Sequence, residues 1–287
     1  MKKILVIGAS GFLGKALIQE LPKKFETIGT YNKNTVEGFV KLDINNPVEL
    51  KKTLDTVSPE IVVLAAAEAN VDAYETDASI SAVQIHSAKI IAEWCKQNNA
   101  LLVFVSSDAV FDGSNAPYRE TDSAKPISSY GRNKLDIEKI AQKVKRHLVL
   151  RTSTLYGIPV SPDKFIGKSI IRLLRAESFP AAVDWIRTPT LTRDFALALI
   201  KLVEKKQSGL FHVAGGSRLS MYEIALAVAR EFNANQGLVK KGSISEIKLP
   251  AKRGKDTSLS ISKIESLGIR MSSIEEGLKY IHGNMKN

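Results

Sequence analysis

Three glycines spaced three residues apart follow a short apolar run at the start of the chain. The run covers residues 4–7, and Gly8, Gly11 and Gly14 come directly after it, before a stretch with helical periodicity that extends to about residue 21. A strand that turns tightly into a helix needs residues without a Cβ where its backbone approaches a phosphate, and the helix N-terminus then offers free N–H groups to that anion. The spacing therefore predicts a site for the pyrophosphate of a dinucleotide.

Short β-branched runs alternate with amphipathic stretches along the first half of the chain. The runs cover residues 4–7, 27–30, 61–64, 101–105 and 148–150, and helix-like segments separate most of them. This alternation is typical of βαβ units, so the predicted fold is α/β, a doubly wound parallel sheet with a smaller C-terminal substrate lobe. We place the dinucleotide-binding domain at residues 1–156 and the lobe at 157–287, with a strand near 210–214 that is a candidate to return to the main sheet.

Local signals mark the start of several helices. Asn46 followed by a proline and Glu49 indicates an N-cap, and Ser220 with Glu223 indicates a capping box. Further helices are expected near residues 162–176 and 191–204. The basic segment 240–255 is expected to be a mobile surface loop.

The composition argues against several classes of function. The 287-residue chain has one cysteine, Cys95, so it can form neither an intrachain disulfide nor a cysteine zinc cluster, which favours a cytoplasmic location. No stretch approaches the roughly 18 apolar residues of a membrane span, and the four histidines lack the spacing of metal ligands. The formal net charge of +11 attracts polyanions, but the basic residues are spread along the chain without a recognition motif. We therefore expect no nucleic acid, membrane or metal as a partner.

The end of the second predicted strand bears on the choice of cofactor. A site that prefers NAD places an acidic residue about 20 residues beyond the glycines, but Thr30, Tyr31, Asn32 and Lys33 occupy that region. Because Lys33 can pair with a 2′-phosphate, the sequence favours NADP(H), with NAD(H) as the alternative. The other interpretation is an exposed Lys33 that contacts nothing. Asp43 is expected either at the adenine ring or as a surface acid that precedes a helix.

Tyr130 and Lys134 stand four residues apart in a predicted helix and therefore share one face. The strand at 101–105 ends in Ser106, Ser107 and Asp108, at the edge of the sheet where such folds bind ligands. A phenol has a pKa of about 10, and a neighbouring cation lowers that pKa toward neutrality. The candidate cations are the ammonium of Lys134 and the oxidised nicotinamide ring. We expect Tyr130 to donate a proton to a carbonyl oxygen held by Ser107, while a reduced nicotinamide delivers hydride to the carbon. A helix-surface pair without function is the alternative.

Several blocks of the sequence together point to a known family. They are GASGFLG at 8–14, SSDAVFDG at 106–113 and YGRNKL at 130–135, with further matches at 65–67, 71–72, 117–120, 151–153, 188–190 and 253–259. These blocks resemble the extended short-chain dehydrogenase/reductases and, more narrowly, the dTDP-4-dehydrorhamnose reductase family. The resemblance implies a Rossmann-type fold and an NADPH-dependent oxidoreductase that reduces the C4 ketone of dTDP-4-dehydro-6-deoxy-L-mannose to dTDP-L-rhamnose.

The resemblance also implies roles for individual residues. Ser107, Tyr130 and Lys134 match the catalytic hydroxyl, acid and lysine of the family. The residues expected to bind the cofactor are Gly8, Ser10, Gly11, Phe12, Leu13, Gly14, Tyr31, Asn32, Lys33, Asp43, Ile44, Ala65, Ala66, Ala67, Ser106, Tyr130 and Lys134. Those expected to bind a nucleotide-sugar substrate are Val71, Ser107, Asp108, Thr154, Trp185 and Arg253.

Three positions depart from the family pattern and bear on the identity of the sugar. Ala109 stands where the family usually has Tyr, Thr154 where bacterial reductases often have Trp, and Gln84 where Asn is common. The same blocks resemble the regulatory β subunit of methionine adenosyltransferase, which shares the Ser-Ser-Asp sequence. A dinucleotide-binding regulatory subunit is therefore one alternative function, and a related nucleotide-sugar reductase or epimerase is another. A homodimer is one candidate assembly.

Overall fold

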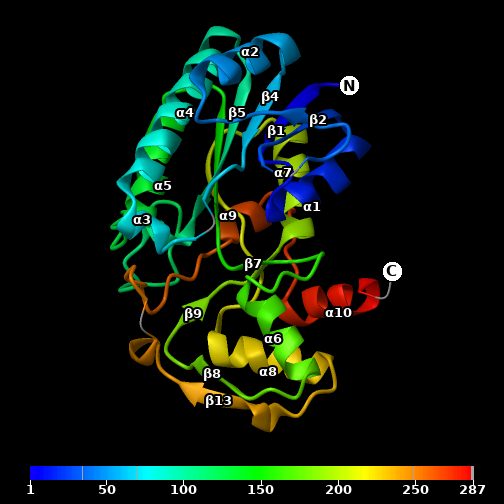
Figure 1. The fold of residues 1–287 in the computed structure, drawn as a ribbon, viewed down its shortest axis with the longest axis vertical. Coiled ribbons are helices and arrows are strands. Elements are labelled where there is room, and N and C mark those ends of the chain that lie inside the picture. The colour runs from blue at the N-terminus through cyan, green and yellow to red at the C-terminus, as the bar shows by residue number, and fades with distance from the viewer. Residues whose placement is uncertain (34, 69, 248, 286–287) are drawn as a thin grey trace.

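Seven parallel strands form the central sheet of the computed structural model, which describes residues 1–33, 35–68, 70–247 and 249–285 (Figure 1). Their order in space is β11–β6–β5–β4–β1–β2–β3, and all neighbours pair in parallel. The strands are β1 (Lys3–Ile7), β2 (Glu26–Tyr31), β3 (Val40–Lys41), β4 (Ile61–Leu64), β5 (Leu101–Ser107), β6 (His147–Thr152) and β11 (Gly209–His212). The chain builds outward from β1 in both directions, which confirms the predicted doubly wound α/β fold.

Helices cover both faces of this sheet because alternate strand residues point to opposite sides. Ile4 and Val6 pack in one cluster with side chains of α1 (Phe12–Glu20) and α7 (Thr192–Glu204). Leu5 and Ile7 pack in the other cluster, against the helices α2 (Pro47–Val57), α4 (Ala78–Gln97) and α5 (Ser129–Ala141). Both layers bury continuous apolar runs, as the sequence of the strands predicted.

A smaller lobe lies below the carboxyl edge of the sheet in Figure 1. Its core joins the three helices α6 (Phe165–Leu174), α8 (Met221–Glu231) and α10 (Ile274–Asn284) to the strand pair of β8 (Phe179–Ala182) and β13 (Val239–Gly242). The short elements are α3 (Ala73–Thr76), β7 (Leu155–Tyr156), β9 (Ile186–Arg187), β10 (Thr190–Leu191), β12 (Leu219–Ser220) and α9 (Ser262–Glu265), with 3-10 turns at Leu21–Lys23, Asp108–Val110, Gln236–Leu238 and Ile244–Glu246. The expected helix at 162–176 is shorter, because Lys164 is its N-cap.

The expected helix starts are present with the predicted chemistry. The side chain of Asn46 accepts hydrogen bonds from the backbone N–H groups of Val48 and Glu49. Ser220 and Glu223 form a reciprocal capping box at the start of α8. These caps satisfy N–H groups that have no partner inside the helix.

The basic segment 240–255 differs from the expected surface loop. It begins inside β13, which pairs with β8, and its residue Ala251 is buried. Residues 249–257, which we call the strap, run from the smaller lobe toward the sheet domain. Asp256 of the strap forms an isolated β-bridge with Ile186, and Leu259, just beyond the strap, forms another with Tyr118. The strap is held in place because its backbone and side chains contact residues of both lobes. The charge composition of this segment does not predict these contacts. Within the described ranges, no helix is long and apolar enough to cross a membrane.

Candidate active site

Two adjoining cavities form a cleft at the carboxyl edge of the sheet. One has a volume of about 410 Å³ and lies between the sheet, the smaller lobe and the strap, and the other has a volume of about 420 Å³ and lies beside the end of β2. The residues that line both are Gly8, Gly11, Ala65, Ala67 and Glu68. The cleft therefore runs across the point between β1 and β4 where the strand order reverses, which is the usual ligand position in this type of sheet.

The three glycines of the first turn are required for different reasons. Gly8 has a φ of +94°, and a Cβ there would lie 2.6 Å from the backbone N of Ala66. A Cβ at Gly14 would lie 2.1 Å from the carbonyl oxygen of Gly8, so α1 can approach β1 only through a glycine. At Gly11 a Cβ would meet only that same oxygen, at 3.2 Å, and its remaining surroundings are open. Ligand access thus accounts for Gly11, whereas Gly8 and Gly14 serve the packing of the protein itself.

The N-terminus of α1 is available to an anion. Gly11 is its N-cap and no side chain caps the first turn, so the leading N–H groups face the cavity that Phe12 and Leu13 line. The ammonium of Lys164, from the smaller lobe, lies 5.9 Å from the centre of the Phe12 ring. A dinucleotide diphosphate fits this combination of helix dipole and cation.

The second cavity collects the residues expected at the adenosine end of a cofactor. Tyr31, Asn32 and Lys33 line it at the end of β2, and Leu42, Ile44 and Gln84 line its walls. Asp43 is not among the lining residues. Its carboxylate accepts hydrogen bonds from the Asn32 side chain at 3.4 Å and from the Asn45 backbone N–H at 3.0 Å. Asp43 therefore orients Asn32, and its contact with the adenine ring stays a prediction.

Tyr130 and Ser107 meet at the centre of the first cavity because α5 approaches the end of β5 closely. Gly131 permits this approach, since a Cβ at that position would lie 2.1 Å from the carbonyl oxygen of Ala109. Ser128 caps the helix by accepting a hydrogen bond from the Gly131 N–H at 3.1 Å. The helix start thus places the phenol of Tyr130 beside the hydroxyl of Ser107, as the sequence predicted.

Lys134 lies one helical turn from Tyr130 and is almost fully buried. Its ammonium donates a hydrogen bond to the carbonyl oxygen of Val105 at 3.1 Å and lies 5.6 Å from the centre of the Tyr130 ring. Burial lowers the pKa of Lys134 to about 8, and the negative charge of Glu138 opposes that decrease. The ammonium form therefore predominates at pH 7.

The pKa of Tyr130 moves in the direction opposite to the expectation. Burial raises this pKa to about 12, and the charge of Asp108 adds to the increase, whereas a hydrogen bond with Ser107 and the charge of Arg253 oppose it. The expectation rested on the ammonium of Lys134 lowering the phenol pKa, but desolvation of the phenolate outweighs nearby cations in this enclosed position. Tyr130 therefore keeps its proton at neutral pH.

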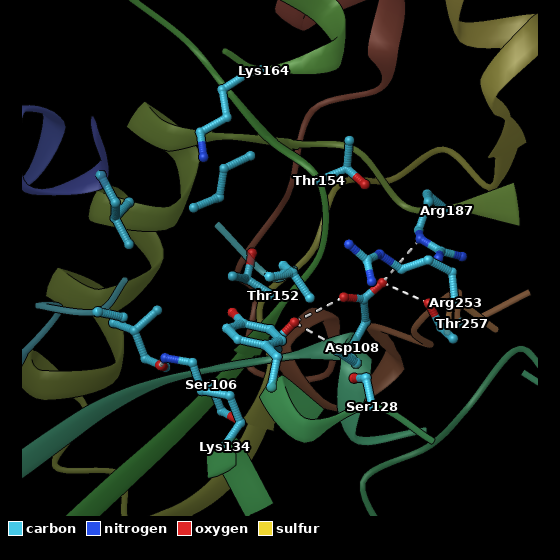
Figure 2. A pocket seen from close by; sticks show the side chains of 18 of the residues that line it. Ser106, Asp108, Ser128, Lys134, Thr152, Thr154, Lys164, Arg187, Arg253 and Thr257 are labelled. Carbon is cyan, nitrogen blue, oxygen red and sulfur yellow. Dashed lines mark hydrogen bonds and ion pairs between the residues drawn. The ribbon is translucent and has the colours of Figure 1, made fainter. Parts of the chain in front are cut away.

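A buried carboxylate, Asp108, links four segments beside these residues, and Figure 2 shows its contacts with Arg187 and Thr257. It accepts hydrogen bonds from Ser107 at 3.0 Å, from Ser153 at 2.8 Å and from Thr257 of the strap at 2.6 Å. The guanidinium of Arg187 lies 3.4 Å away and also donates to the carbonyl oxygen of Gly254. Sequence reasoning missed Arg187, Ser153 and Thr257, because they reach the site only through the packing of the smaller lobe against the sheet.

A second buried charge pair lies under Lys134. Glu138 accepts hydrogen bonds from Ser106 at 2.5 Å and from Arg151 at 2.9 and 2.7 Å. The i, i+4 spacing on α5 could have placed Glu138 next to Lys134, but no local signal places Arg151 of β6 beside Glu138. Ser106 lines the cavity, so the pair supports the wall of the cofactor site from below.

The expected substrate residues gather at the side of the cavity nearest the smaller lobe. Val71, Thr154 and Trp185 line it, and Thr154 has a φ of +40°, which is rare for a β-branched residue. Arg253 lines it as well and pairs with Asp72 at 3.0 Å. Among the described residues, no group of three or more His, Cys, Asp or Glu side chains has an arrangement that could hold a metal ion.

Two buried polar atoms in the wall of the first cavity indicate what kind of ligand this cavity binds. Among the described residues, Thr152 Oγ1 and Trp185 Nε1 are buried without a hydrogen-bond partner in the protein. Buried polar groups are normally paired, so these atoms indicate a ligand with polar groups at this depth. Together with the open side of Gly11, they fit a dinucleotide and a polar second ligand in one cleft.

Comparisons with known proteins agree with this geometry. The model of the family described as RmlD substrate binding domain matches residues 1–286. The dTDP-4-dehydrorhamnose reductase of Aggregatibacter actinomycetemcomitans is 30% identical over 98% of both chains. Methionine adenosyltransferase 2 subunit beta of Mus musculus is 29% identical over 93% of this chain and 83% of its own. The crystal structure of dTDP-4-dehydrorhamnose reductase from Bacillus anthracis in complex with NADP superposes with a TM-score of 0.89 at 26% identity, covering 98% of each chain.

Proposed function

Because the chain belongs to the RmlD substrate binding domain family, we propose that it is an NADPH-dependent reductase of a 4-keto-6-deoxy sugar nucleotide. The favoured substrate is dTDP-4-dehydrorhamnose, and the product is dTDP-L-rhamnose. One observation carries the proposal: the phenol of Tyr130, the hydroxyl of Ser107 and the ammonium of Lys134 share one cavity with the glycine turn. Relatives that match over nearly the whole chain carry the reductase name and, in one structure, NADP.

Different residues of the cleft would bind the cofactor and supply charge in such a reaction. The open side of Gly11 and the start of α1 would hold the diphosphate of the cofactor, and Lys33, which lines the second cavity, would pair with a 2′-phosphate. NADPH supplies the hydride when it is bound. Lys134 supplies positive charge below the phenol, within a wall that Glu138 and Arg151 support.

Tyr130 acts as the general acid in this proposal. Its raised pKa keeps the proton on the phenol at neutral pH, so the residue is ready to protonate an oxygen that gains negative charge as the ketone is reduced. The phenol lines the cavity, so a bound substrate that displaces water there would strengthen the interaction of the phenol with that oxygen. The division of the chain into a cofactor domain, 1–156, and a mainly substrate-binding lobe, 157–287, is part of this proposal, with α7 and β11 of the second range packed in the sheet domain. The cytoplasmic location and the homodimer stay predictions.

The test is turnover by the purified protein. We expect loss of the absorbance of reduced cofactor when NADPH and dTDP-4-dehydrorhamnose are both present, and a slower loss or none with NADH. Other 4-keto sugar nucleotides in the same assay establish which sugar and which base the site prefers. Absence of turnover on every 4-keto sugar nucleotide would remove the reductase proposal.

A regulatory subunit is the second candidate function. The similarity to methionine adenosyltransferase 2 subunit beta covers 93% of this chain, at an identity close to that of the reductase relative. Tight binding of NADPH without turnover, together with co-purification with a larger enzyme, would favour this candidate. Catalytic turnover with a kcat of ordinary size, on the order of 1 per second or more, would exclude it as the main role.

A further inference from the structure

The short helix α3 lies beside the start of the helix that carries Tyr130 (Figure 1). The carboxylate of Glu75 in α3 accepts hydrogen bonds from the backbone N–H and from the hydroxyl of Ser129, both at 2.7 Å. Ser129 is the first residue of α5 and directly precedes Tyr130. Glu75 therefore attaches α3 to the first turn of α5, next to the candidate general acid.

The strap holds the other end of α3. Asp72, the N-cap residue of α3, accepts hydrogen bonds at 3.0 Å from the backbone N–H of Ala251 and from the guanidinium of Arg253. The side chain of Arg253 is 16% exposed and that of Asp72 is 25% exposed. An ion pair with so little contact with water is screened less than a surface pair. Helix α3 is thus held at both ends, by the strap and by α5.

Between these two attachments, the ring of Tyr74 is buried against Tyr130. Tyr74 is 3% exposed, and the centres of the two rings lie 5.1 Å apart with an angle of 78° between their planes. This edge-to-face arrangement is one of the geometries that aromatic pairs favour. The ammonium of Lys134 lies 5.6 Å from the centre of the Tyr130 ring. The ring of Tyr130 therefore packs against one aromatic ring and one cation, which together restrict its orientation.

The hydroxyl of Tyr74 is held in place as well. It accepts a hydrogen bond from the side-chain amide of Gln84 at 2.7 Å and donates one to the carbonyl oxygen of Glu68 at 3.3 Å. Gln84 is one of the positions that depart from the family pattern, and this contact gives its longer side chain a partner. Burial and the proximity of the ionisable phenol of Tyr130 raise the pKa of Tyr74, so Tyr74 remains uncharged.

We propose that Tyr74 is a positioning residue: its ring, held by Gln84 and by both ends of α3, sets the orientation of the Tyr130 ring and so directs the phenolic hydroxyl toward the substrate oxygen. This inference rests on the proposed reductase function. A general acid must lie within hydrogen-bond distance of its acceptor, and a misplacement of about 1 Å can cost about 100-fold in rate. Tyr74 is not among the described residues that line the two cavities, so it acts on the reaction only through Tyr130.

Removal of the Tyr74 ring tests this role. Tyr74→Leu is expected to lower kcat about 10-fold or more, while the KM of the sugar nucleotide and the Kd for NADPH change by less than about threefold. Tyr74→Phe keeps the ring and is expected to retain at least about one third of the parent kcat. Tyr222→Leu, on α8, is the matched control and is expected to leave kcat unchanged. A parent-like kcat in Tyr74→Leu, a loss of equal size in Tyr74→Phe, or a loss that appears in KM or Kd instead would overturn the proposal.

A double-mutant cycle separates positioning from a merely structural role. In the Tyr130→Phe background, Tyr74→Leu is expected to leave the residual rate unchanged, because the group that Tyr74 orients no longer carries a proton. The free energy of unfolding of each variant, measured by urea denaturation, establishes that the proteins compared are folded. A further loss by the same factor as in the parent would show that Tyr74 does not act through Tyr130.

A second variant covers the case in which Tyr74→Leu does not fold. Gln84→Met removes the amide that donates to the Tyr74 hydroxyl and keeps the length of the side chain. At saturating NADPH, it is expected to lower kcat about two- to threefold in the parent and to have no effect in the Tyr74→Phe background, where that hydroxyl is gone. An equal effect in both backgrounds, or no effect in either, contradicts the role of Gln84 in holding Tyr74.

The orientation of the Tyr130 ring is also measurable without turnover. In crystal structures of the parent and of Tyr74→Phe we expect one orientation of this ring, and in Tyr74→Leu we expect a displaced ring or more than one orientation. The same single orientation in Tyr74→Leu would overturn the positioning role, even in a protein with full activity. Absence of turnover in the parent, by contrast, would overturn only the reductase proposal.

Discussion

At the scale of single residues, burial acts on Tyr130 and Lys134 in opposite directions. It disfavours the charged form of each, so the pKa of the phenol rises to about 12 while the pKa of the ammonium falls to about 8. The enclosed pair therefore holds a protonated phenol beside a cation at pH 7. This combination suits proton donation to a reduced carbonyl oxygen and does not require a phenolate in the resting protein.

Removing the phenolic hydroxyl is expected to stop the chemistry without affecting cofactor binding. Tyr130→Phe should lower kcat by about 100-fold or more, since the general acid is lost, while the Kd for NADPH changes by less than about threefold. Single-turnover rates and a fluorescence titration with NADPH measure the two quantities. Tyr280→Phe, on α10, is the control. Activity within a few-fold of the parent in Tyr130→Phe would assign the proton to another donor.

Lys33 carries the predicted preference for NADPH. It lines the second cavity at the end of β2, where the neighbouring residues Tyr31 and Asn32 are uncharged. Lys33→Glu is expected to raise the Kd for NADPH about tenfold or more, because a carboxylate repels a 2′-phosphate, and to leave the Kd for NADH unchanged or lower. Lys205→Glu on the exposed end of α7 controls for net charge. If the ratio of the Kd for NADPH to the Kd for NADH does not change, Lys33 does not determine the cofactor preference.

At the scale of elements, the contact between β1 and α1 depends on one missing side chain. Gly14→Ala would place a Cβ 2.1 Å from the Gly8 carbonyl oxygen and must displace the helix from the strand. We expect a loss of about 3 kcal/mol or more in the free energy of unfolding, measured by urea denaturation. Gly283→Ala in α10 is the matched control, since a Cβ there meets nothing within 4 Å, and it should be neutral or stabilising by up to about 1 kcal/mol. Equal stability of the two variants would contradict the packing argument.

The strand at the sheet edge, β11, carries a buried histidine that makes stability depend on pH. His212 is fully buried, and burial, together with the charge of Arg151, lowers its pKa from about 6.5 to about 3. Below pH 6.5 the unfolded chain binds a proton there and the folded chain does not, so this contribution is complete above pH 6.5 and decreases toward pH 3.

The expected loss from His212 between pH 7 and pH 5 is about 2 kcal/mol of unfolding free energy. His212→Asn, which does not titrate, should be less stable at pH 7 but should lose about 2 kcal/mol less than the parent on acidification. Urea denaturation of both proteins at the two pH values gives this difference. His86→Gln serves as the control, and parallel pH dependence in the parent and His212→Asn would show that His212 does not determine the acid sensitivity.

At the scale of the whole molecule, the site is built from both lobes. The sheet domain supplies the glycine turn, Ser107 and Tyr130, and the smaller lobe with the strap supplies Arg187, Thr257 and Arg253. Asp108 and Asp72 of the sheet domain bind the strap through Thr257 and Arg253. The two lobes therefore depend on each other for the shape of the cavity.

Arg253 is expected to serve the sugar nucleotide rather than the cofactor. Arg253→Ala should raise the KM of the sugar nucleotide about tenfold or more through loss of a cation at the substrate side, with little change in the Kd for NADPH. Arg175→Ala, on the exposed end of α6, is the control. Because Arg253 also pairs with Asp72, the free energy of unfolding of the variant is measured in parallel. If NADPH binding weakens as much as substrate binding does, Arg253 does not serve the sugar nucleotide specifically.

The residue spacing along the chain determined the sheet and the part of the site that contains the glycine turn, Ser107, Tyr130 and Lys134. The periodicity of the apolar runs predicts parallel strands covered on both faces, and the glycine spacing predicts the turn that precedes α1. Tyr130 and Lys134 share a helix face, and Ser107 ends a strand next to that helix, so residue spacing and the edge of the sheet together bring them close. These relations are local or follow from the alternation of strands and helices.

Only the tertiary structure decided what surrounds those residues. The side chains that contact Asp108 from distant segments are those of Ser153, Arg187 and Thr257, which lie 45 to 149 positions further along the sequence. Nothing in the local sequence around these three residues predicts that they contact Asp108. The pKa of Tyr130 likewise depends on how completely its neighbours exclude water, so the sequence predicted the wrong direction. Sequence periodicity specifies which face of an element is buried, whereas the packing of distant segments specifies which polar groups share that buried space.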